Sequence, residues 1–183
     1  MNYIFPSYFY CKYQAPNAEQ LISSLSKYTE EDINNSLFTW GTESSSEKVP
    51  IKWEDYYTLL QPSVDIFASH IGSGFNYKMH DPWLNIYNRG QFQEVHSHSG
   101  HDFSCVFFVN VGENFSNFYF YDRNEISTSV KLKSLLKHYT SHVINDIKTG
   151  DILFFPSHML HGVSPHNNDI PRKTFATNFD INT

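Results

Sequence analysis

The chain has 183 residues, of which 40% are hydrophobic and 17% charged, an ordinary composition for one globular domain spanning 1–183. Its net charge of −6, without a cluster of Lys and Arg, excludes a general nucleic-acid-binding surface. No segment approaches the roughly 20 consecutive apolar residues that cross a membrane, so we expect no membrane partner.

The first part of the chain, 1–74, is predicted to form a support region with helices and an edge strand. Residues 3–13 are rich in aromatic side chains and interrupted by a proline, which favours an edge strand because proline cannot donate to a ladder. We expect a helix to begin at Asn17, whose side chain can cap it. A second helical segment covers 53–71, in which Pro62 either bends the helix or begins a new one.

The second part, 75–183, is predicted to be an all-β core. Short aromatic and β-branched runs alternate there with turn residues, a pattern typical of a sandwich or barrel. Glycine-containing turns at 88–90 and 148–150 come directly before two histidine-bearing segments. The predicted strands are 83–87, 103–109, 115–121, 142–147, 152–155 and 174–179.

The two cysteines, Cys11 and Cys105, are far apart and belong to no CxxC pattern, so we expect free thiols in a reducing compartment. The first residues lack a basic segment followed by an apolar run, so no signal peptide is predicted. We therefore expect a cytoplasmic protein, in the host cytoplasm if a phage encodes it.

Three histidines in the β core form a pattern that predicts a metal site. His96 and His98 are two apart, and alternate residues of a strand share a face. His161 follows a separate apolar run that starts at Gly150. Three side chains on one face of an octahedral ion leave three positions free, as in iron(II) oxygenases, although that triad usually has two histidines and one carboxylate. Zinc also fits three histidines and an open position.

Arg172 follows His161 by eleven residues and precedes the apolar run 175–179, which is typical of a core strand. A guanidinium that points inward from such a strand needs an anion, and it binds a carboxylate through two parallel hydrogen bonds. Thr174 lies on the same face and can add a hydroxyl. The sequence therefore predicts an anionic co-substrate beside the metal.

These residues resemble the 2-oxoglutarate/iron(II) oxygenase superfamily, and within it a group found in phages and marine bacteria. The resemblance covers roughly 83–179: a first half at 83–107, a second half at 150–165 and a terminal strand at 172–178. The N-terminal third is only loosely similar.

The resemblance implies a fold class that is mainly β with N-terminal helices, a double-stranded β-helix of the jelly-roll, cupin-like kind. It implies an enzyme that uses Fe(II) and 2-oxoglutarate and hydroxylates a substrate with release of succinate and carbon dioxide. The protein supplies ligands, orientation and a dry pocket, while the metal supplies the redox chemistry.

The resemblance also implies roles for individual residues. His96 and His161 correspond to metal ligands, and His98 takes the position of the carboxylate. Asp102 is an alternative third ligand. For the co-substrate, the distal carboxylate would be bound by Arg172 with Thr174, with a further hydrogen bond from Asn85 or Tyr87.

Two other readings remain open. A cupin that does not use 2-oxoglutarate would bind metal through His96, His98, Asp102 and His161 and would have no need of a buried Arg172. The second alternative is a non-catalytic phage protein with a degenerate site, since a fold does not fix a function.

The sequence does not identify the substrate, which can be a small molecule, an amino acid or a prolyl residue, and it does not fix the oligomeric state. Segments 42–48 and 124–137 are candidates for covering the pocket, and the second carries Lys131, Lys133 and Lys137, for which a solvated face is the more ordinary role. Candidates for the pocket wall, for most of which core packing is the more ordinary role, are Tyr87, Phe107, Tyr119, Phe154 and Met159.

Overall fold

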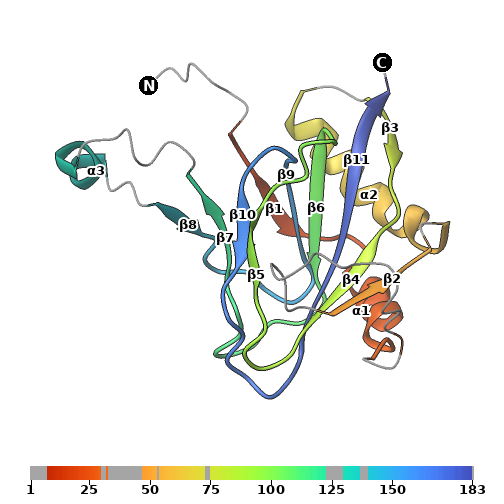
Figure 1. Ribbon diagram of the computed structural model, residues 1–183. Coiled ribbons are helices and arrows are strands. Elements are labelled where there is room, and N and C mark those ends of the chain that lie inside the picture. Colours follow the sequence, from red (N-terminus) through yellow and green to blue (C-terminus); the bar gives the residue numbers. More distant parts are fainter. Residues whose placement is uncertain are drawn as a thin grey trace.

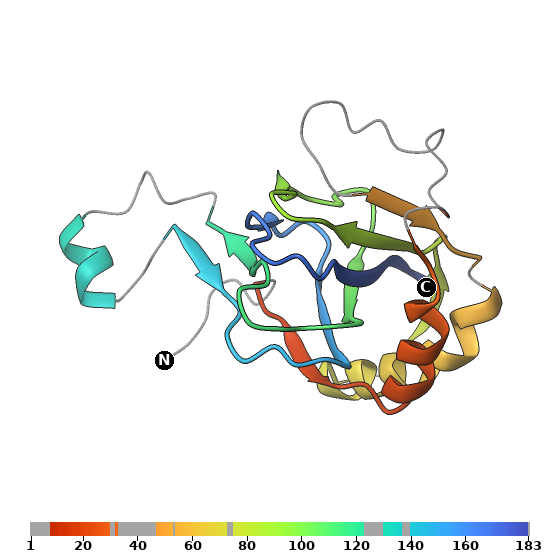
Figure 2. The ribbon, with the colours of Figure 1, turned by 90° about the horizontal axis from the view of Figure 1, so that it is seen from below.

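The computed structural model describes residues 8–29, 32, 47–52, 54–72, 75–122, 130–136 and 140–182. They form two antiparallel sheets packed face to face, with two helices against the outer face of the larger sheet (Figures 1 and 2). The helices are α1 (Ala18–Ser26), α2 (Glu54–His70) and α3 (Val130–Leu136), and the strands are β1 (Cys11–Gln14), β2 (Glu47–Pro50), β3 (Asn76–Met79), β4 (Trp83–Tyr87), β5 (Gln93–His96), β6 (Phe103–Phe108), β7 (Phe118–Tyr121), β8 (Ser141–Val143), β9 (Asp151–Pro156), β10 (His161–Val163) and β11 (Arg172–Asn182).

The larger sheet has the strand order β1-β9-β6-β11-β4-β2, and β3 also pairs with β11. The eleven-residue β11 holds this sheet together, because its first half pairs with β4 and its second half with β3, while β6 runs along its other side. The smaller sheet has the order β5-β10-β7-β8. The mainly β architecture expected from the sequence is confirmed.

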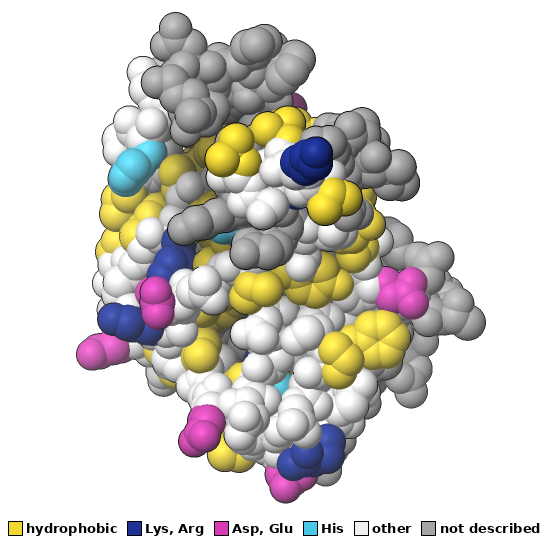
Figure 3. Space-filling view, turned by 90° about the vertical axis from the view of Figure 1, so that its left-hand side faces the viewer, with side chains coloured by type: hydrophobic (Ala, Val, Ile, Leu, Met, Phe, Trp, Pro, Cys, Tyr) yellow, Lys and Arg dark blue, Asp and Glu magenta, His cyan; other side chains and the backbone are white. Residues whose placement is uncertain are grey.

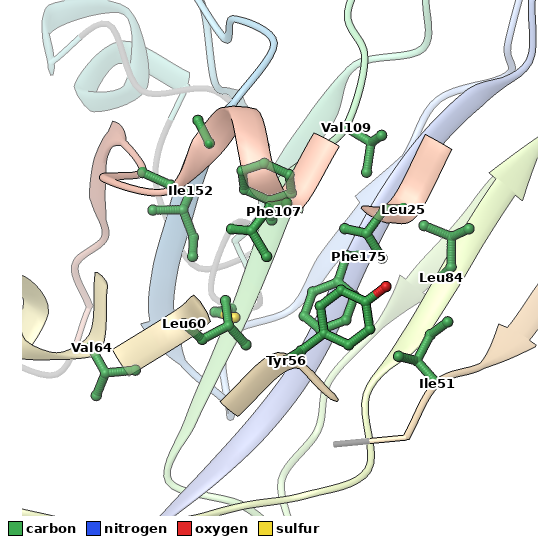
Figure 4. Packing of buried hydrophobic residues seen from close by; sticks show 14 of the residues in the cluster. Leu25, Ile51, Tyr56, Leu60, Val64, Leu84, Phe107, Val109, Ile152 and Phe175 are labelled. Atoms are coloured by element: carbon green, nitrogen blue, oxygen red, sulfur yellow. The ribbon is translucent and has the colours of Figure 1, made fainter. Parts of the chain in front are cut away.

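Side chains alternate between the two faces of the larger sheet, because successive residues of a strand point to opposite sides. One set packs against α1 and α2 in a core that includes Leu84, Phe107, Ile152 and Phe175 (Figure 4). The other set, with Val106, Phe108, Leu153 and Phe155 among its members, packs against Phe118, Phe120 and Val163 of the smaller sheet. Each face of the larger sheet is therefore buried.

Because side chains alternate between the two faces, part of the predicted pocket wall was wrong. Phe107 and Phe154 lie in the helix-side core, on the face turned away from the smaller sheet. Tyr87 and Met159 lie in the core between the sheets. Tyr119 lies on β7 of the smaller sheet and is only partly buried.

The helices agree with the sequence, except at one cap. α1 buries Leu21 and Leu25 against α2 and the sheet. The side chain of Asn17 makes no cap hydrogen bond, so that prediction was wrong; its amide donates to the carbonyl oxygen of Leu59 on α2 at 3.3 Å. α2 passes through Pro62 without ending.

The N-terminal region does more than support the β core, since it contributes β1 and β2 to the larger sheet. β1 is an edge strand, as predicted, although residues 3–7 of the predicted segment lie outside the described residues. β2 begins at Glu47, inside the segment 42–48 that was expected to cover the pocket, and residues 42–46 lie outside the described residues.

Both predicted glycine turns are confirmed. Gly90 and Gly150 have φ angles of 85° and 87°, a region that residues with a side chain rarely adopt. The first turn leads into β5, and the second leads directly into β9, the strand before His161. Each turn therefore sets the entry to one of the histidine-bearing segments.

The described part of the second proposed cover, α3, lies beyond β8 at one end of the molecule in both ribbon views, away from the space between the sheets (Figures 1 and 2). Residues 124–129 and 137 of that segment lie outside the described residues. On the face seen in Figure 3, the basic and acidic side chains of the described residues are scattered. Among the described residues, no helix is long and apolar enough to span a membrane.

Candidate active site

Three histidines meet on the smaller sheet. His96 at the end of β5 and His161 at the start of β10 are direct Cα partners in the antiparallel pair, and His98 follows two residues after His96. One ring nitrogen from each histidine lies within 4.8 Å of those of the other two. The ring centres are 4.3 Å apart for His96 and His161, 5.0 Å for His96 and His98, and 5.3 Å for His98 and His161.

Backbone carbonyls orient two of these rings. The Nδ1 of His96 lies 2.8 Å from the carbonyl oxygen of Glu94, and the Nδ1 of His161 lies 2.9 Å from that of Met159. A carbonyl oxygen can only accept, so each Nδ1 carries the proton and donates it. The Nε2 of each ring is then unprotonated, which is the state that a metal ligand needs.

The ring of His98 contacts a buried set of polar side chains. Its Nδ1 lies 3.2 Å from the amide nitrogen of Asn178, and the Oδ1 of that amide accepts a hydrogen bond from the Ser104 hydroxyl at 2.8 Å. The Ser104 and Ser157 hydroxyl oxygens are 2.7 Å apart. A half-turn of the amide would let its oxygen accept a hydrogen bond from the Nδ1–H of His98, because the Ser104 hydroxyl can then accept from the amide nitrogen instead of donating to its oxygen. His98 can therefore present its Nε2 as well.

His161 is buried, whereas His96 and His98 are partly buried. Burial, followed by the nearby His96 and His98, lowers the pKa of His161 well below its ordinary value. The imidazole is therefore kept neutral, with its lone pair available at neutral pH.

The structure does not bring Asp102 to the three histidines. Asp102 is exposed, and its carboxylate accepts a hydrogen bond from the backbone N–H of Ile181 at 2.8 Å. Its own backbone N–H donates to the carbonyl oxygen of Phe179. Asp102 thus fastens the turn after His98 to β11.

Arg172 lies at the start of β11 and is only 2% exposed. Its guanidinium carbon lies 5.1 Å from the centre of the Tyr87 ring and 5.6 Å from that of Phe108. Among the described residues, no side chain or backbone group makes a hydrogen bond with its Nη1. Burial lowers the pKa of Arg172, with Tyr87 acting in the opposite direction, and an arginine stays charged in either case. A buried guanidinium whose Nη1 has no hydrogen-bond partner among the described residues is suited to bind an anion.

The other predicted co-substrate residues surround this guanidinium. Arg172 is paired with Tyr87 across β11 and β4, and Thr174 is paired with Asn85 two residues further on. The amide of Asn85 lies 3.5 Å from the hydroxyl of Thr174. All four side chains line one cavity between the sheets, and the three histidines line the same cavity.

A model of the family described as "Putative 2OG-Fe(II) oxygenase" matches residues 81–178 of the chain. The chain belongs to this family. The match covers every histidine and arginine of the cavity described above, together with Asn178. The enzyme class and cofactors are therefore those of a 2-oxoglutarate and iron(II) oxygenase.

Solved structures of the same class share the fold at low sequence identity. An oxidoreductase of the 2OG-Fe(II) oxygenase family from Burkholderia pseudomallei has a TM-score of 0.66 and 10% identity, over 93% of this chain and 84% of that one. A prolyl-4-hydroxylase from Pseudomonas putida has a TM-score of 0.64 and 14% identity, over 97% and 95%. HygX from Streptomyces hygroscopicus, with nickel and 2-oxoglutarate bound, has a TM-score of 0.64 and 10% identity, over 97% and 85%. The double-stranded β-helix is thereby confirmed.

A comparison of this oxygenase with curated proteins gives no match.

Some cavity residues of this oxygenase were missed by the sequence reasoning. Asn178 and Ser104 line the cavity, and Asn178 lies on β11 at even spacing from Arg172 and Thr174. That spacing places it on the same face of the strand, a signal that the sequence did contain. Trp83 also lines the cavity, and its ring stacks on His98 with centres 5.7 Å apart.

Proposed function

We propose that the chain catalyses the 2-oxoglutarate-dependent hydroxylation of an organic substrate, with release of succinate and carbon dioxide. His96, His98 and His161 would hold iron(II), and Arg172 would hold the distal carboxylate of 2-oxoglutarate. Together, the bound metal and 2-oxoglutarate supply the activation of oxygen that amino-acid side chains cannot provide.

The observation that carries this proposal is the buried Arg172 in the same cavity as the three imidazoles. Its Nη1 has no hydrogen-bond partner among the described residues, and an unpaired charge inside a protein is costly. A carboxylate would remove that cost through charge-assisted hydrogen bonds. A metal-binding protein without an anionic co-substrate has no use for such a residue.

The side chains around Arg172 would orient the co-substrate. The Tyr87 and Phe108 rings hold the guanidinium between the sheets, so that its free donor keeps one direction. The Thr174 hydroxyl, supported by Asn85, would add one hydrogen bond to the same carboxylate. The apolar side chains of Phe118, Phe155 and Val163 line the cavity as well and would exclude water from it.

The third imidazole changes the charge of the site. With His98 in the place of a carboxylate, the metal with its three ligands is one charge more positive. A more positive centre favours the binding of the 2-oxoglutarate dianion. The Asn178–Ser104–Ser157 set would hold His98 in the orientation that a charged ligand would otherwise secure through its own attraction to the metal.

For the substrate, we propose a small molecule, an amino acid or a prolyl residue. The structures of similar fold include a prolyl-4-hydroxylase and HygX, which has also been solved with hygromycin B bound. They support the prolyl residue and the small molecule, respectively.

The experiment is an assay of succinate formation with iron(II), 2-oxoglutarate and oxygen, first without substrate and then with candidate substrates. We expect slow succinate release from the wild type and none from His161→Ala or Arg172→Ala. The matched control is Arg89→Ala, since Arg89 is an exposed arginine paired with Asp169. Equal succinate formation by the wild type and both cavity variants would contradict the proposal.

A further inference from the structure

A second group of metal-ligating side chains lies outside the cavity. His80, between β3 and β4, His101, between β5 and β6, and Asp180, on β11, each place one potential ligand atom within 4.8 Å of the other two. None of the three lines the cavity that holds the triad and Arg172.

The carboxylate of Asp180 lies between the two imidazoles. Its Oδ2 is 2.6 Å from the Nε2 of His80, and its Oδ1 is 3.0 Å from the Nδ1 of His101. The two ring centres are 4.2 Å apart, and the ring planes are tilted by 52° to each other. The side chains are 28%, 27% and 36% exposed, in the order His80, His101 and Asp180, so an ion can reach them from solvent.

The backbone holds these side chains in place. The N–H of His80 donates to the carbonyl oxygen of Asn178 at 2.9 Å, and the His80 carbonyl oxygen accepts from the Thr177 hydroxyl at 2.7 Å. The N–H of His101 donates to the carbonyl oxygen of His98 at 3.0 Å. The three ligand atoms are therefore brought together by the fold itself, so an ion would have little ordering entropy to overcome.

We propose that His80, His101 and Asp180 form a second divalent-cation site, of the kind that binds Zn²⁺. Two imidazoles and one carboxylate, with a fourth position left for water, are a donor set that zinc accepts in tetrahedral sites. Imidazole nitrogens suit zinc and other late transition metals, whereas magnesium and calcium prefer oxygen ligands alone. The carboxylate of Asp180, which contacts both imidazoles, supplies the anionic ligand of this donor set.

Binding requires a lone pair on the ring nitrogens that now face Asp180. The proton on each of these nitrogens moves to the other nitrogen of the same ring, or to solvent if the ring is charged. The carboxylate oxygens then contact the ion in place of the two N–H groups. No redox step is involved.

The His80, His101 and Asp180 site is linked to His98 of the triad through two short chain segments. His101 follows His98 by three residues and donates to its carbonyl oxygen, and Asp180 is two residues from Asn178, which contacts the His98 ring. An ion between His101 and Asp180 would tie the turn after His98 to β11. We expect it to stabilise the ligand-bearing turn and to raise the melting temperature of the chain.

The test is a count of Zn²⁺ bound per chain, by equilibrium dialysis of the full-length protein and elemental analysis. We expect two ions for the wild type, one for His161→Ala, one for Asp180→Asn and none for the double variant. His142→Asn is the control, because His142 is exposed and belongs to neither group, and it should keep both ions.

The outcomes separate the two sites. If the triad held no metal, the wild type would bind one ion and Asp180→Asn none, which would leave the second site standing. If His161→Ala bound no zinc, or if Asp180→Asn bound as much as the wild type, the second site would be overturned. The His161→Ala count does not depend on whether Asp180→Asn folds, and a His101→Asn variant repeats the test with a different ligand removed.

Discussion

His96 and His161 lie directly opposite each other on β5 and β10, and the Nδ1 of each ring donates to the carbonyl oxygen two residues earlier in the chain. The same kind of local hydrogen bond thus orients both imidazoles of this strand pair. The antiparallel register makes them neighbours, and the two hydrogen bonds leave both Nε2 atoms unprotonated.

Substituting either of these residues should remove the metal. We expect His96→Ala and His161→Ala each to weaken iron(II) retention more than about 100-fold, since changing only an outer partner of a ligand already costs 10–100-fold. Anaerobic dialysis followed by iron analysis measures this. His158→Ala, at an exposed position outside both histidine groups, should retain iron as the wild type does. A His96→Ala variant with unchanged affinity would remove His96 from the ligand set.

Asn178 should act as a positioning residue for His98. Asn178→Leu removes the amide that contacts the ring, and we expect iron(II) to bind 10–100-fold more weakly with the three histidines still present. Ser104→Ala, one contact further from the metal, should weaken binding less. The relative size of the two losses in iron(II) affinity tests this role. A larger loss in Ser104→Ala than in Asn178→Leu would show that these polar side chains stabilise the fold and do not position His98.

The glycine turns offer a matched pair for stability. Gly90 and Gly150 have nearly the same positive φ, but a Cβ at Gly90 meets nothing within 4 Å, whereas at Gly150 it meets the Gln14 amide and the Ala18 side chain. Gly90→Ala should therefore cost about 1 kcal/mol from backbone strain alone. Gly150→Ala should cost more, because α1 and the end of β1 must also shift. Urea unfolding of both variants measures the difference, and equal costs would mean that the Gln14 side chain moves aside freely.

Because the thiol of Cys105 is buried, the free energy of unfolding should decrease with pH in the alkaline range. Burial raises the pKa of Cys105 from 9.0 to about 12. The folded chain therefore keeps a proton that the unfolded chain loses above pH 9, so its stability is complete below pH 9 and falls as the pH rises toward 12. The slope contributed by this group is about 1.4 kcal/mol per pH unit.

The measurement is urea unfolding of the wild type and Cys105→Ala at pH 8, 9 and 10. Comparing the two chains cancels the titration of Cys11 and the tyrosines. The destabilisation of Cys105→Ala at pH 8 should shrink as the pH rises, because only the wild type loses stability through this thiol. A difference that stays constant with pH would contradict the burial of a neutral thiol.

Much of the β core could be predicted from the sequence, because its strands are short apolar runs bounded by turn residues. The segment 83–87 matches β4 in both bounds, and the predicted strand 174–179 lies within β11. Strands that join a sheet from its edge were harder to predict. β2 and β3 have four residues each and little apolar character, and only pairing with β4 and β11 makes them strands.

The triad and Arg172 could be singled out because each lies on a recognisable strand at a recognisable spacing. The His80, His101 and Asp180 group could not, since its members are 21 and 79 residues apart and come from three different segments. His80 alone is an ordinary histidine. Likewise, the capping role assigned to Asn17 failed because the carbonyl of Leu59, 42 residues away, takes its amide.

If the histidine triad and Arg172 form a single site, iron(II) and 2-oxoglutarate bind there together. An anaerobic titration of the iron(II)-loaded protein with 2-oxoglutarate measures this through the weak visible charge-transfer band. We expect a band in the wild type and in Arg89→Ala, and a 2-oxoglutarate affinity lowered by roughly 100-fold in Arg172→Ala, from the loss of charge-assisted hydrogen bonds. Iron(II) binding without a band in the wild type, or a band of unchanged affinity in Arg172→Ala, would contradict the single site.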